Sequence, residues 1–191
     1  RGHRYLSVRE FDRAFADLTR GGAIDSTIYG IWYHLGIVQY LRGDFAEAAA
    51  SFAKAQPIAP DAGELAGSTD WLWMSLSRAG RGAEAKAMLA RRPEKPVATA
   101  YTRRLQLYRG EIGPDAVITS ADTDEVQVAT LAYGLGNWYL VRGDKVQLRQ
   151  SPKQYMKRIV DQFNLAKWVG QEQARDKLIQ DGYRGNAPYV A

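Results

Sequence analysis

Residues 29–62 constrain the fold more than any other stretch, because they specify two helices and the turn between them. The residues that define the pattern are, in order, Trp32, Leu35, Gly36, Gly43, Asp44, Phe45, Ala48, Phe52, Ala55 and Pro60. Gly36 and Ala48 are small where two helix backbones must approach closely, and Phe52 can fill the space between them. Pro60 stops the second helix. The stretch therefore predicts a tight helical hairpin.

The turn inside this hairpin has its own signals. Gly43 suits the left-handed residue that ends a helix. Asp44 is expected to cap the second helix, with Glu47 three residues later completing a capping box. The order and spacing resemble the tetratricopeptide repeat, in which a large-Leu-Gly-large helix A packs on an Ala-Phe-Ala helix B. An arbitrary helical hairpin would show apolar periodicity but not this set of identities.

Weaker copies of the pattern lie on both sides. A shift of 34 residues places Gly2 at the position of Gly36 and Leu18 at that of Phe52. The predicted repeats are residues 1–28 (partial), 29–62, 63–96, 97–124 (degenerate) and 125–144 (partial). The loops and helix starts expected between them are Gly21-Gly22 with Asp25-Ser26, Ser68-Thr69-Asp70, Pro96 and Gly113-Pro114-Asp115. The resemblance thus implies an all-α, tetratricopeptide-like solenoid of helical hairpins over residues 1–144.

Residues 145–191 differ from the rest in charge and in pattern. Residues 1–144 contain 17 Lys and Arg and 17 Asp and Glu, so the net charge of +5 lies entirely in the last 47 residues. The repeat pattern fails at Pro152, and the following residues alternate apolar and basic at helical spacing. We expect a basic C-terminal tail of amphipathic helices. Its sequence resembles the cytosolic segment of Tad-type pilus platform proteins, relatives of the type II secretion F family, in SPKQYMKRIVDQFNL, ARDKL and GYRGNAPYV. A pair of helices that caps the solenoid is the simpler alternative.

Composition narrows the class of protein. A content of 46% hydrophobic and 25% charged residues is typical of a folded globular chain. The chain has no cysteine, which excludes disulfides and thiolate chemistry but fits either the bacterial cytoplasm or the periplasm. No run is long and apolar enough to span a membrane.

Few residues are candidates for chemistry. His3 and His34 are the only histidines and should approach each other on neighbouring helices A, but without Cys or carboxylate neighbours they do not predict a metal site. The glycines at 134 and 136 lack the third glycine and the strand of a dinucleotide loop, so they more readily serve helix packing. No nucleophile motif is present. We expect no catalytic residue, no cofactor and no metal.

The resemblance implies a peptide-binding groove lined by helices A. The groove positions are His3, Leu6, Tyr33, Ile37, Tyr40, Met74 and Arg78. The family's carboxylate clamp of Lys, Asn and Arg is replaced by His3, His34, Gly67 and Trp71, so a chaperone C-terminus is not the expected ligand. Tyr33 and Tyr40 suggest an apolar or aromatic contact, although burial against the next repeat explains either equally well.

The tail carries a second candidate surface, formed by Lys153, Lys157, Arg158 and Lys167. Peripheral contact with an acidic membrane is compatible with it, a solvated basic face is the simpler interpretation, and nucleic acid is not an expected partner. The sequence therefore predicts a non-enzymatic scaffold of the tetratricopeptide type that binds a protein or peptide partner. The alternative is a component of bacterial pilus or type II-like secretion machinery that acts through the tail.

Overall fold

The structure is a computed structural model that describes residues 1–91, 97–144 and 146–147. Every regular element in these ranges is helical, which confirms the predicted all-α class for the described part of the chain. The α-helices are α1 (Gly2–Ser7), α2 (Phe11–Ile24), α3 (Tyr29–Arg42), α4 (Phe45–Ala55), α5 (Ala62–Arg78), α6 (Gly82–Leu89), α7 (Ala100–Arg109) and α8 (Glu125–Val141). Short 3-10 helices are η1 (Gln56–Ile58) and η2 (Pro114–Ala116).

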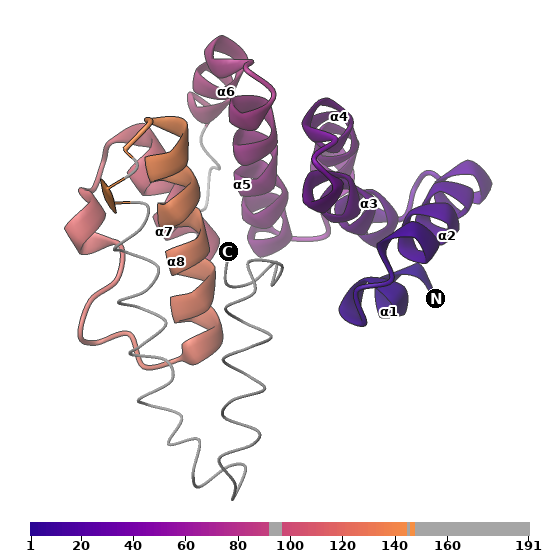
Figure 1. The fold of residues 1–191 in the computed structure, drawn as a ribbon, viewed down its shortest axis with the longest axis horizontal. Helices are drawn as coiled ribbons and strands as arrows, with labels where there is room; N and C mark the ends of the chain where they lie inside the picture. The colour runs from indigo at the N-terminus through magenta and orange to yellow at the C-terminus, as the bar shows by residue number, and fades with distance from the viewer. Residues whose placement is uncertain (92–96, 145, 148–191) are drawn as a thin grey trace, which may run out of the picture. The chain divides into compact units, whose positions relative to one another are not determined.

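The chain divides into two compact units, Arg1–Leu105 and Gln106–Ala191. In the first unit, α1 to α6 pack in chain order, each helix against the next (Figure 1). In addition, α1 contacts α3 and α3 contacts α5, so alternate helices also lie beside each other. Helices α1 to α6 are therefore assembled mainly from contacts between helices that are close in the sequence.

The central hairpin of α3 and α4 is packed most tightly at Gly36. A Cβ atom on Gly36 would lie only 2.7–2.8 Å from ring carbons of Phe52, closer than Cβ atoms approach other atoms. Ala48 and Phe52 have no exposed surface. The predicted close approach at Gly36 and Ala48, with Phe52 between the helices, is confirmed.

The first hairpin, α1 with α2, repeats this contact on a smaller scale. A Cβ atom on Gly2 would lie 2.7 Å from Cγ of Leu18, and Ala14 has no exposed surface. Leu6 joins the same apolar core, at 7% exposure. A glycine on the first helix thus faces a large side chain on the second helix in both hairpins.

Helices α1, α3, α5, α7 and α8 are followed by the same kind of turn in the described residues. In each turn a residue with positive φ donates its amide to the carbonyl three residues earlier, and the next amide bonds to the carbonyl five residues earlier. The left-handed residues are Arg9 (φ 62°), Gly43 (88°), Gly80 (76°), Gly110 (74°) and Gly143 (73°). The predicted role of Gly43 is confirmed. Arg9 occupies a conformation for which the other four turns use glycine.

The predicted helix start at Ser68-Thr69-Asp70 is wrong. Helix α5 begins at Ala62, where the Asp61 carboxylate accepts hydrogen bonds from the amides of Gly63 and Glu64. Ser68 and Asp70 lie in the middle of this helix with no exposed surface. They resemble capping residues because a short polar side chain can cap a helix or find a partner in the core, and the sequence pattern does not distinguish these roles.

The prediction of a loop at Gly21-Gly22 is also wrong, because both glycines lie inside α2. A Cβ atom on Gly21 would lie 3.1 Å from Ile31, and one on Gly22 would lie 3.2 Å from Trp32. The two glycines therefore let the end of α2 pack against the start of α3. The loop itself begins at Asp25, as expected, and its carboxylate accepts bonds from the amide and hydroxyl of Thr27.

The predicted capping box at the start of α4 is not formed. Asp44 does precede α4, but its side chain makes no capping hydrogen bond. Its carboxylate instead accepts a hydrogen bond from Nε of Arg42 at 3.3 Å. A basic neighbour two residues earlier therefore competes with the backbone for this carboxylate.

The remaining predicted elements are partly described. Helix α7 ends before Gly110 as expected, whereas its predicted start at Pro96 lies outside the described residues. At the Gly113-Pro114-Asp115 signal the chain forms the short 3-10 helix η2. Helix α8 is capped by Asp124, and Gly134 with Gly136 are buried within it, which confirms that this stretch is helical. None of the described helices is long and apolar enough to cross a membrane.

Candidate functional site

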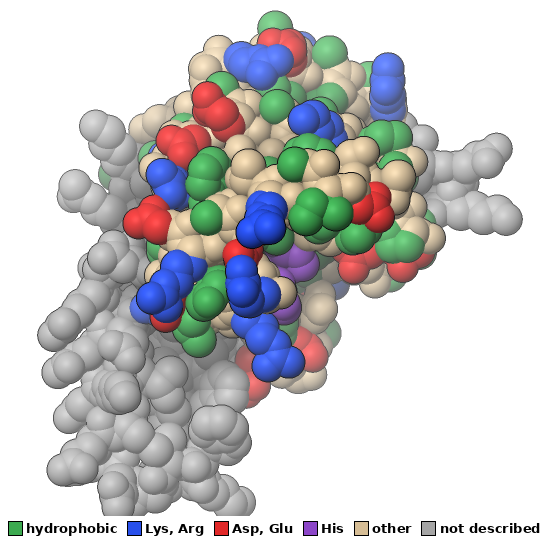
Figure 2. Space-filling model, turned by 90° about the vertical axis from the view of Figure 1, so that its right-hand side faces the viewer, with side chains coloured by type: hydrophobic (Ala, Val, Ile, Leu, Met, Phe, Trp, Pro, Cys, Tyr) green, Lys and Arg blue, Asp and Glu red, His purple; other side chains and the backbone are tan. Residues whose placement is uncertain are grey.

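A row of interacting side chains runs through the first unit on its alternate helices, which are α1, α3, α5 and the part of α7 that belongs to this unit. It starts at the surface with His3 on α1 and His34 on α3, whose ring centroids lie 4.3 Å apart. This confirms the prediction that the two histidines approach each other. His3 is exposed and His34 is partly buried. Figure 2 shows histidine side chains at the surface beside Lys and Arg side chains.

The backbone fixes the protonation state of one nitrogen of His34. Nδ1 lies 2.6 Å from the carbonyl oxygen of Gly30. Since a carbonyl only accepts, Nδ1 must carry a proton and Nε2 is the nitrogen that titrates. Burial lowers the pKa of His34, and the neighbouring His3 lowers it further by a smaller amount. The hydrogen bond to Gly30 acts in the opposite direction, because it favours the charged ring. Two positive charges about 4 Å apart repel by about 1 kcal/mol in water and by about 4 kcal/mol at an effective dielectric constant of 20.

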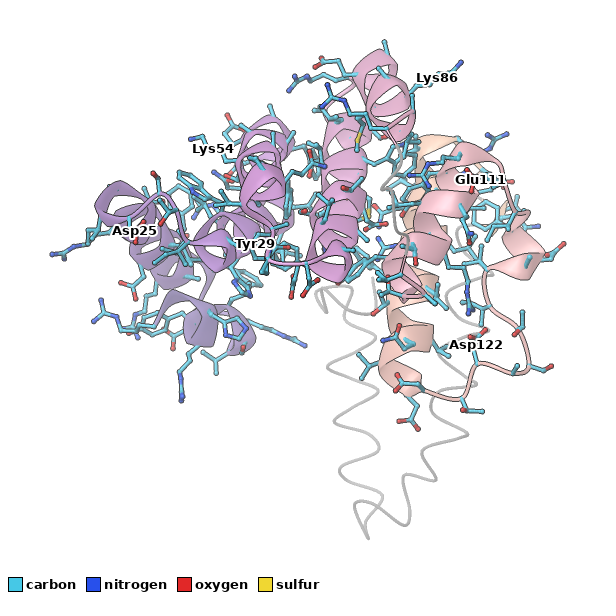
Figure 3. The ribbon with its side chains drawn as sticks, turned by 180° about the vertical axis from the view of Figure 1, so that it is seen from behind. Asp25, Tyr29, Lys54, Lys86, Glu111 and Asp122 are labelled. Carbon is cyan, nitrogen blue, oxygen red and sulfur yellow. The ribbon has the colours of Figure 1, made fainter. Side chains whose placement is uncertain are left out.

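Two tyrosines continue the row along α3. The ring of Tyr33 lies edge-on to His34, at 5.5 Å between centroids, and stacks on Tyr29 at 5.4 Å. The Tyr29 hydroxyl donates to the carbonyl of Glu64 on α5 at 2.8 Å; Figure 3 labels Tyr29 on α3. Burial raises the pKa of both tyrosines, so they remain neutral. Their hydroxyls therefore serve as links between helices.

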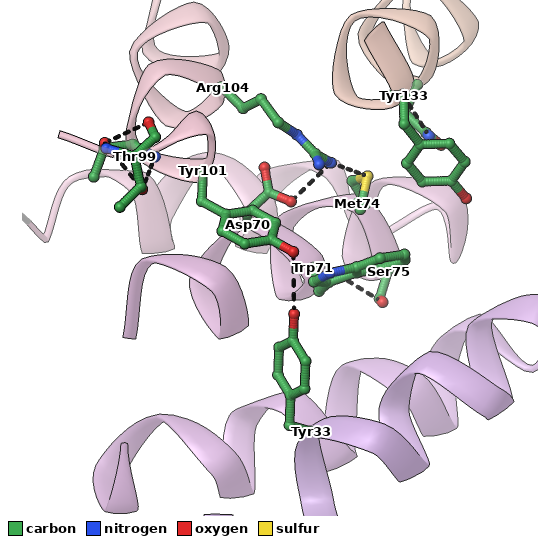
Figure 4. Close-up of polar contacts among 11 residues, drawn as sticks. Tyr33, Asp70, Trp71, Met74, Ser75, Thr99, Tyr101, Arg104 and Tyr133 are labelled. Carbon is green, nitrogen blue, oxygen red and sulfur yellow. Dashed lines mark hydrogen bonds and ion pairs between the residues drawn. The ribbon is translucent and has the colours of Figure 1, made fainter. Parts of the chain in front are cut away.

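Tyr33 reaches α7 across a glycine of α5. Its hydroxyl lies 3.3 Å from the hydroxyl of Tyr101, as Figure 4 shows. A Cβ atom on Gly67 would lie 3.4 Å from the ring of Tyr101 and 3.6 Å from the Tyr33 hydroxyl. Gly67 thus leaves the space in which the two tyrosines meet.

The row ends in a buried ion pair. Nη2 of Arg104 on α7 lies 2.8 Å from a carboxylate oxygen of Asp70 on α5, with side-chain exposures of 1% and 0% (Figure 4). The same nitrogen donates to Sδ of Met74 at 3.0 Å, and the guanidinium lies 5.6 Å from the centre of the Tyr101 ring. Burying two charges costs several kcal/mol per ion, which the mutual attraction offsets only with good geometry. The pair joins α5 to α7.

The predicted groove residues fall into two groups. His3 and Arg78 are exposed, and Tyr33 and Ile37 are partly buried. Tyr40 is only 4% exposed and Met74 is fully buried, so neither side chain is available to a partner in this structure. The ring of Tyr40 packs edge-on against Trp71 and Phe45, at 5.3 Å and 5.1 Å between ring centroids. Of the two roles that the sequence allowed for Tyr40, groove contact or burial, the structure shows burial. Leu6 belongs to the core. The predicted tail surface of Lys153, Lys157, Arg158 and Lys167 lies outside the described residues.

Sequence reasoning did not identify Asp70, Tyr101 or Arg104 as parts of the site. The signal was nevertheless present, since Asp70 and Arg104 each introduce a charge into a helical apolar pattern. Residues of opposite charge at separations near the repeat length are candidates for such pairs. Asp70 and Arg104 are 34 residues apart in the chain.

A separate hollow of about 600 Å³ lies between the turn that follows α1 and the end of α3. It is lined by Arg9, Glu10, Phe11, Asp12, Arg13, Leu41 and Arg42. Its charges are largely matched within the wall, because Arg13 pairs with Glu10 at 2.7 Å and Arg42 with Asp12 at 2.6 Å. The hollow therefore lacks the concentrated charge of an ion-binding site.

Comparison with known proteins yields no match among protein-family models, curated proteins or solved structures. In the described part of the chain, no group of three or more His, Cys, Asp or Glu side chains is placed to hold a metal ion. In the described part of the chain, the fold and the site together define a helical structure whose alternate helices are joined by a row of aromatic and charged side chains.

Proposed function

We propose that this chain is a non-enzymatic protein-interaction scaffold, a tetratricopeptide-like solenoid that binds a protein or peptide on the face formed by its alternate helices. The observation that carries the proposal is the sequence spacing of contacts between these helices. Tyr29 and Glu64 are 35 residues apart, and Arg104 and Met74 are 30 residues apart. These separations lie close to the 34 residues of one tetratricopeptide unit.

Stacking of successive units also explains why a glycine, Gly67, lies where the rings of Tyr33 and Tyr101 meet. Contacts between residues one repeat apart mean that the same helix position faces its counterpart in the next unit. Tyr33, Gly67 and Tyr101 follow each other at 34-residue intervals, and the hydroxyls of the two tyrosines lie 3.3 Å apart beside Gly67. Solenoids of stacked hairpins present one extended face, and partners commonly bind there.

The exposed start of the row is the part that a partner can reach. His3 is exposed and Ile37 is half-buried on the next of the alternate helices. An apolar or aromatic peptide segment suits this surface, because the neighbouring tyrosine hydroxyls are engaged within the protein. Recognition would therefore rest on ring and methyl contacts with few new hydrogen bonds.

Selection of binders from a random peptide library against the intact chain tests the proposal. His3→Ala with Ile37→Ala should weaken selected peptides about tenfold or more, because a few central contacts carry most binding energy. Glu47→Ala with Lys54→Ala is the matched control, since both residues are exposed on α4. Binders that are equally sensitive to both double variants, or a selection that yields no binders, would contradict the proposed face.

A further inference from the structure

His3 and His34 form a ring contact between α1 and α3, in addition to the packing of α1 on α2. They are the only two histidines in the chain, and their rings lie 4.3 Å apart at an interplanar angle of 49°. His3 belongs to α1 and His34 belongs to α3. Contacts with α2 and α3 hold α1 in place.

The surroundings of His34 disfavour a second positive charge. Its Nδ1 proton is already bound to the Gly30 carbonyl, so protonation at Nε2 creates an imidazolium beside His3. The charges that act on the ring come from His3 on α1 and Glu64 on α5, while Tyr33 presents a neutral ring from the same helix. Among the described groups that influence this ring, α2 and α4 contribute none. Glu64 is exposed, so water screens its attraction.

We propose that the His3–His34 pair is an acid-sensitive latch, which holds α1 against α3 while at most one ring is charged and releases α1 when both rings are protonated. Release separates the two imidazolium rings and returns the partly buried His34 ring to water. Both effects act in the same direction, because like charges repel and a cation is better solvated outside the protein.

The direction of the pH dependence follows from the lowered pKa of His34. In the closed state this pKa lies below the ordinary value of about 6.5, so the open state binds more protons. The contribution of the pair to α1 docking is complete above about pH 6.5 and is lost as the pH falls through the closed-state pKa.

The other contacts of α1 do not change in this pH range. Arg1 contacts Asp17 on α2 at 2.6 Å, and its hydrogen bond lowers the pKa of that carboxyl group. Asp17 therefore stays ionised at pH values where histidines gain protons. The apolar contact of Gly2 with Leu18 does not titrate. A loss of α1 docking between neutral pH and about pH 5 can therefore be assigned to the histidines.

Amide hydrogen exchange of the intact chain at about pH 7.5 and about pH 5, corrected for intrinsic rates, measures the latch. Protection of the α1 amides should fall by about tenfold or more relative to that of α4. In His3→Gln this extra loss should disappear. Arg4→Gln is the matched control, because it removes a positive charge from the exposed side of α1 and leaves both imidazoles intact.

The exchange results distinguish the latch from general acid sensitivity. Equal loss of α1 protection in His3→Gln and in the unmodified protein would overturn the latch, as would unchanged protection in the unmodified protein. Imidazole NMR titration supplies a second measurement, since two histidines give two separable signals. The His34 signal should titrate at a higher pH in His3→Gln than in the unmodified protein, and an unchanged midpoint would contradict coupling between the rings.

Discussion

In the hairpins α1–α2 and α3–α4 the two helices meet at a glycine, whereas α5 and α7 meet at a charged pair. In the two hairpins, Gly2 and Gly36 leave room for Leu18 and Phe52, and these contacts are apolar. The α3–α4 hairpin also holds a buried hydrogen bond from the Ser51 hydroxyl to Oε1 of Gln39. Between α5 and α7, Asp70 and Arg104 are buried at 0% and 1% exposure. The glycine contacts stabilise the hairpins through the apolar area that they bury, whereas the α5–α7 contact depends on the presence of both Asp70 and Arg104. The two regions should therefore respond differently to single substitutions.

The largest effect is expected for Arg104→Met. Removing the guanidinium leaves the buried Asp70 carboxylate without the cation that faces it, which should cost about 3–5 kcal/mol of unfolding free energy. Chemical denaturation monitored by circular dichroism gives this value. The matched control is the double variant Asp70→Leu with Arg104→Met, which should recover most of the loss because an apolar pair needs no charge compensation. A single variant as stable as the parent would show that the pair does not hold α5 and α7.

The glycine contact is tested by Gly36→Leu, which should lower the unfolding free energy by about 1–3 kcal/mol through overpacking against Phe52. Thermal denaturation measures the change. Gly82→Ala is the control, because no atom lies within 4 Å of a Cβ built there. If Gly36→Leu melts with the parent, the α3–α4 contact is looser than its geometry indicates.

A smaller gain is expected for Arg9→Gly. Arg9 holds φ at 62°, a conformation in which a side chain costs roughly 1–2 kcal/mol, partly offset by the greater freedom of glycine when unfolded. The net stabilisation should be about 0.5–1 kcal/mol, seen as a higher melting temperature. Gly43→Ala at the equivalent turn should change stability in the opposite sense. Destabilisation by Arg9→Gly would indicate that the Arg9 side chain makes a contact worth more than the strain.

The smallest effect concerns the link between the two regions. Tyr33→Phe removes the hydroxyl that lies 3.3 Å from Tyr101 and leaves the ring in place. A long hydroxyl contact contributes little, so the loss should be about 0.5–1 kcal/mol. Combining Tyr33→Phe with Arg104→Met in a double-mutant cycle then measures coupling between the tyrosines and the ion pair. Additive effects would mean that the row is a series of separate contacts.

The central hairpin was predictable because its determinants lie close together in sequence. Gly36, Gly43 and Phe52 are identified by helical spacing and by the need for a left-handed turn. The approach of His3 to His34 was predictable as well, since the repeat period places them on neighbouring helices.

Predictions failed where one residue type serves two purposes. Asp70 carries the signal of a helix start because Asp caps helices, yet its partner Arg104 is 34 residues away and no local pattern points to it. Gly21 carries the signal of a loop because glycine breaks helices, but here the lack of a side chain lets Ile31 pack against α2. Both errors concern contacts between helices, which a local signal does not specify.

The packing of each helix against its neighbours in the chain also bears on how fast the first unit can fold. Within the series of helices from α1 to α6, the main contacts join helices that are adjacent, or next to adjacent, in the sequence. Chains with such low contact order close only short loops before native contacts form, and helical proteins of this kind fold within microseconds to milliseconds. A hairpin such as α3–α4 can therefore nucleate first and recruit its neighbours on either side, so synthesis from the N-terminus need not wait for distant segments.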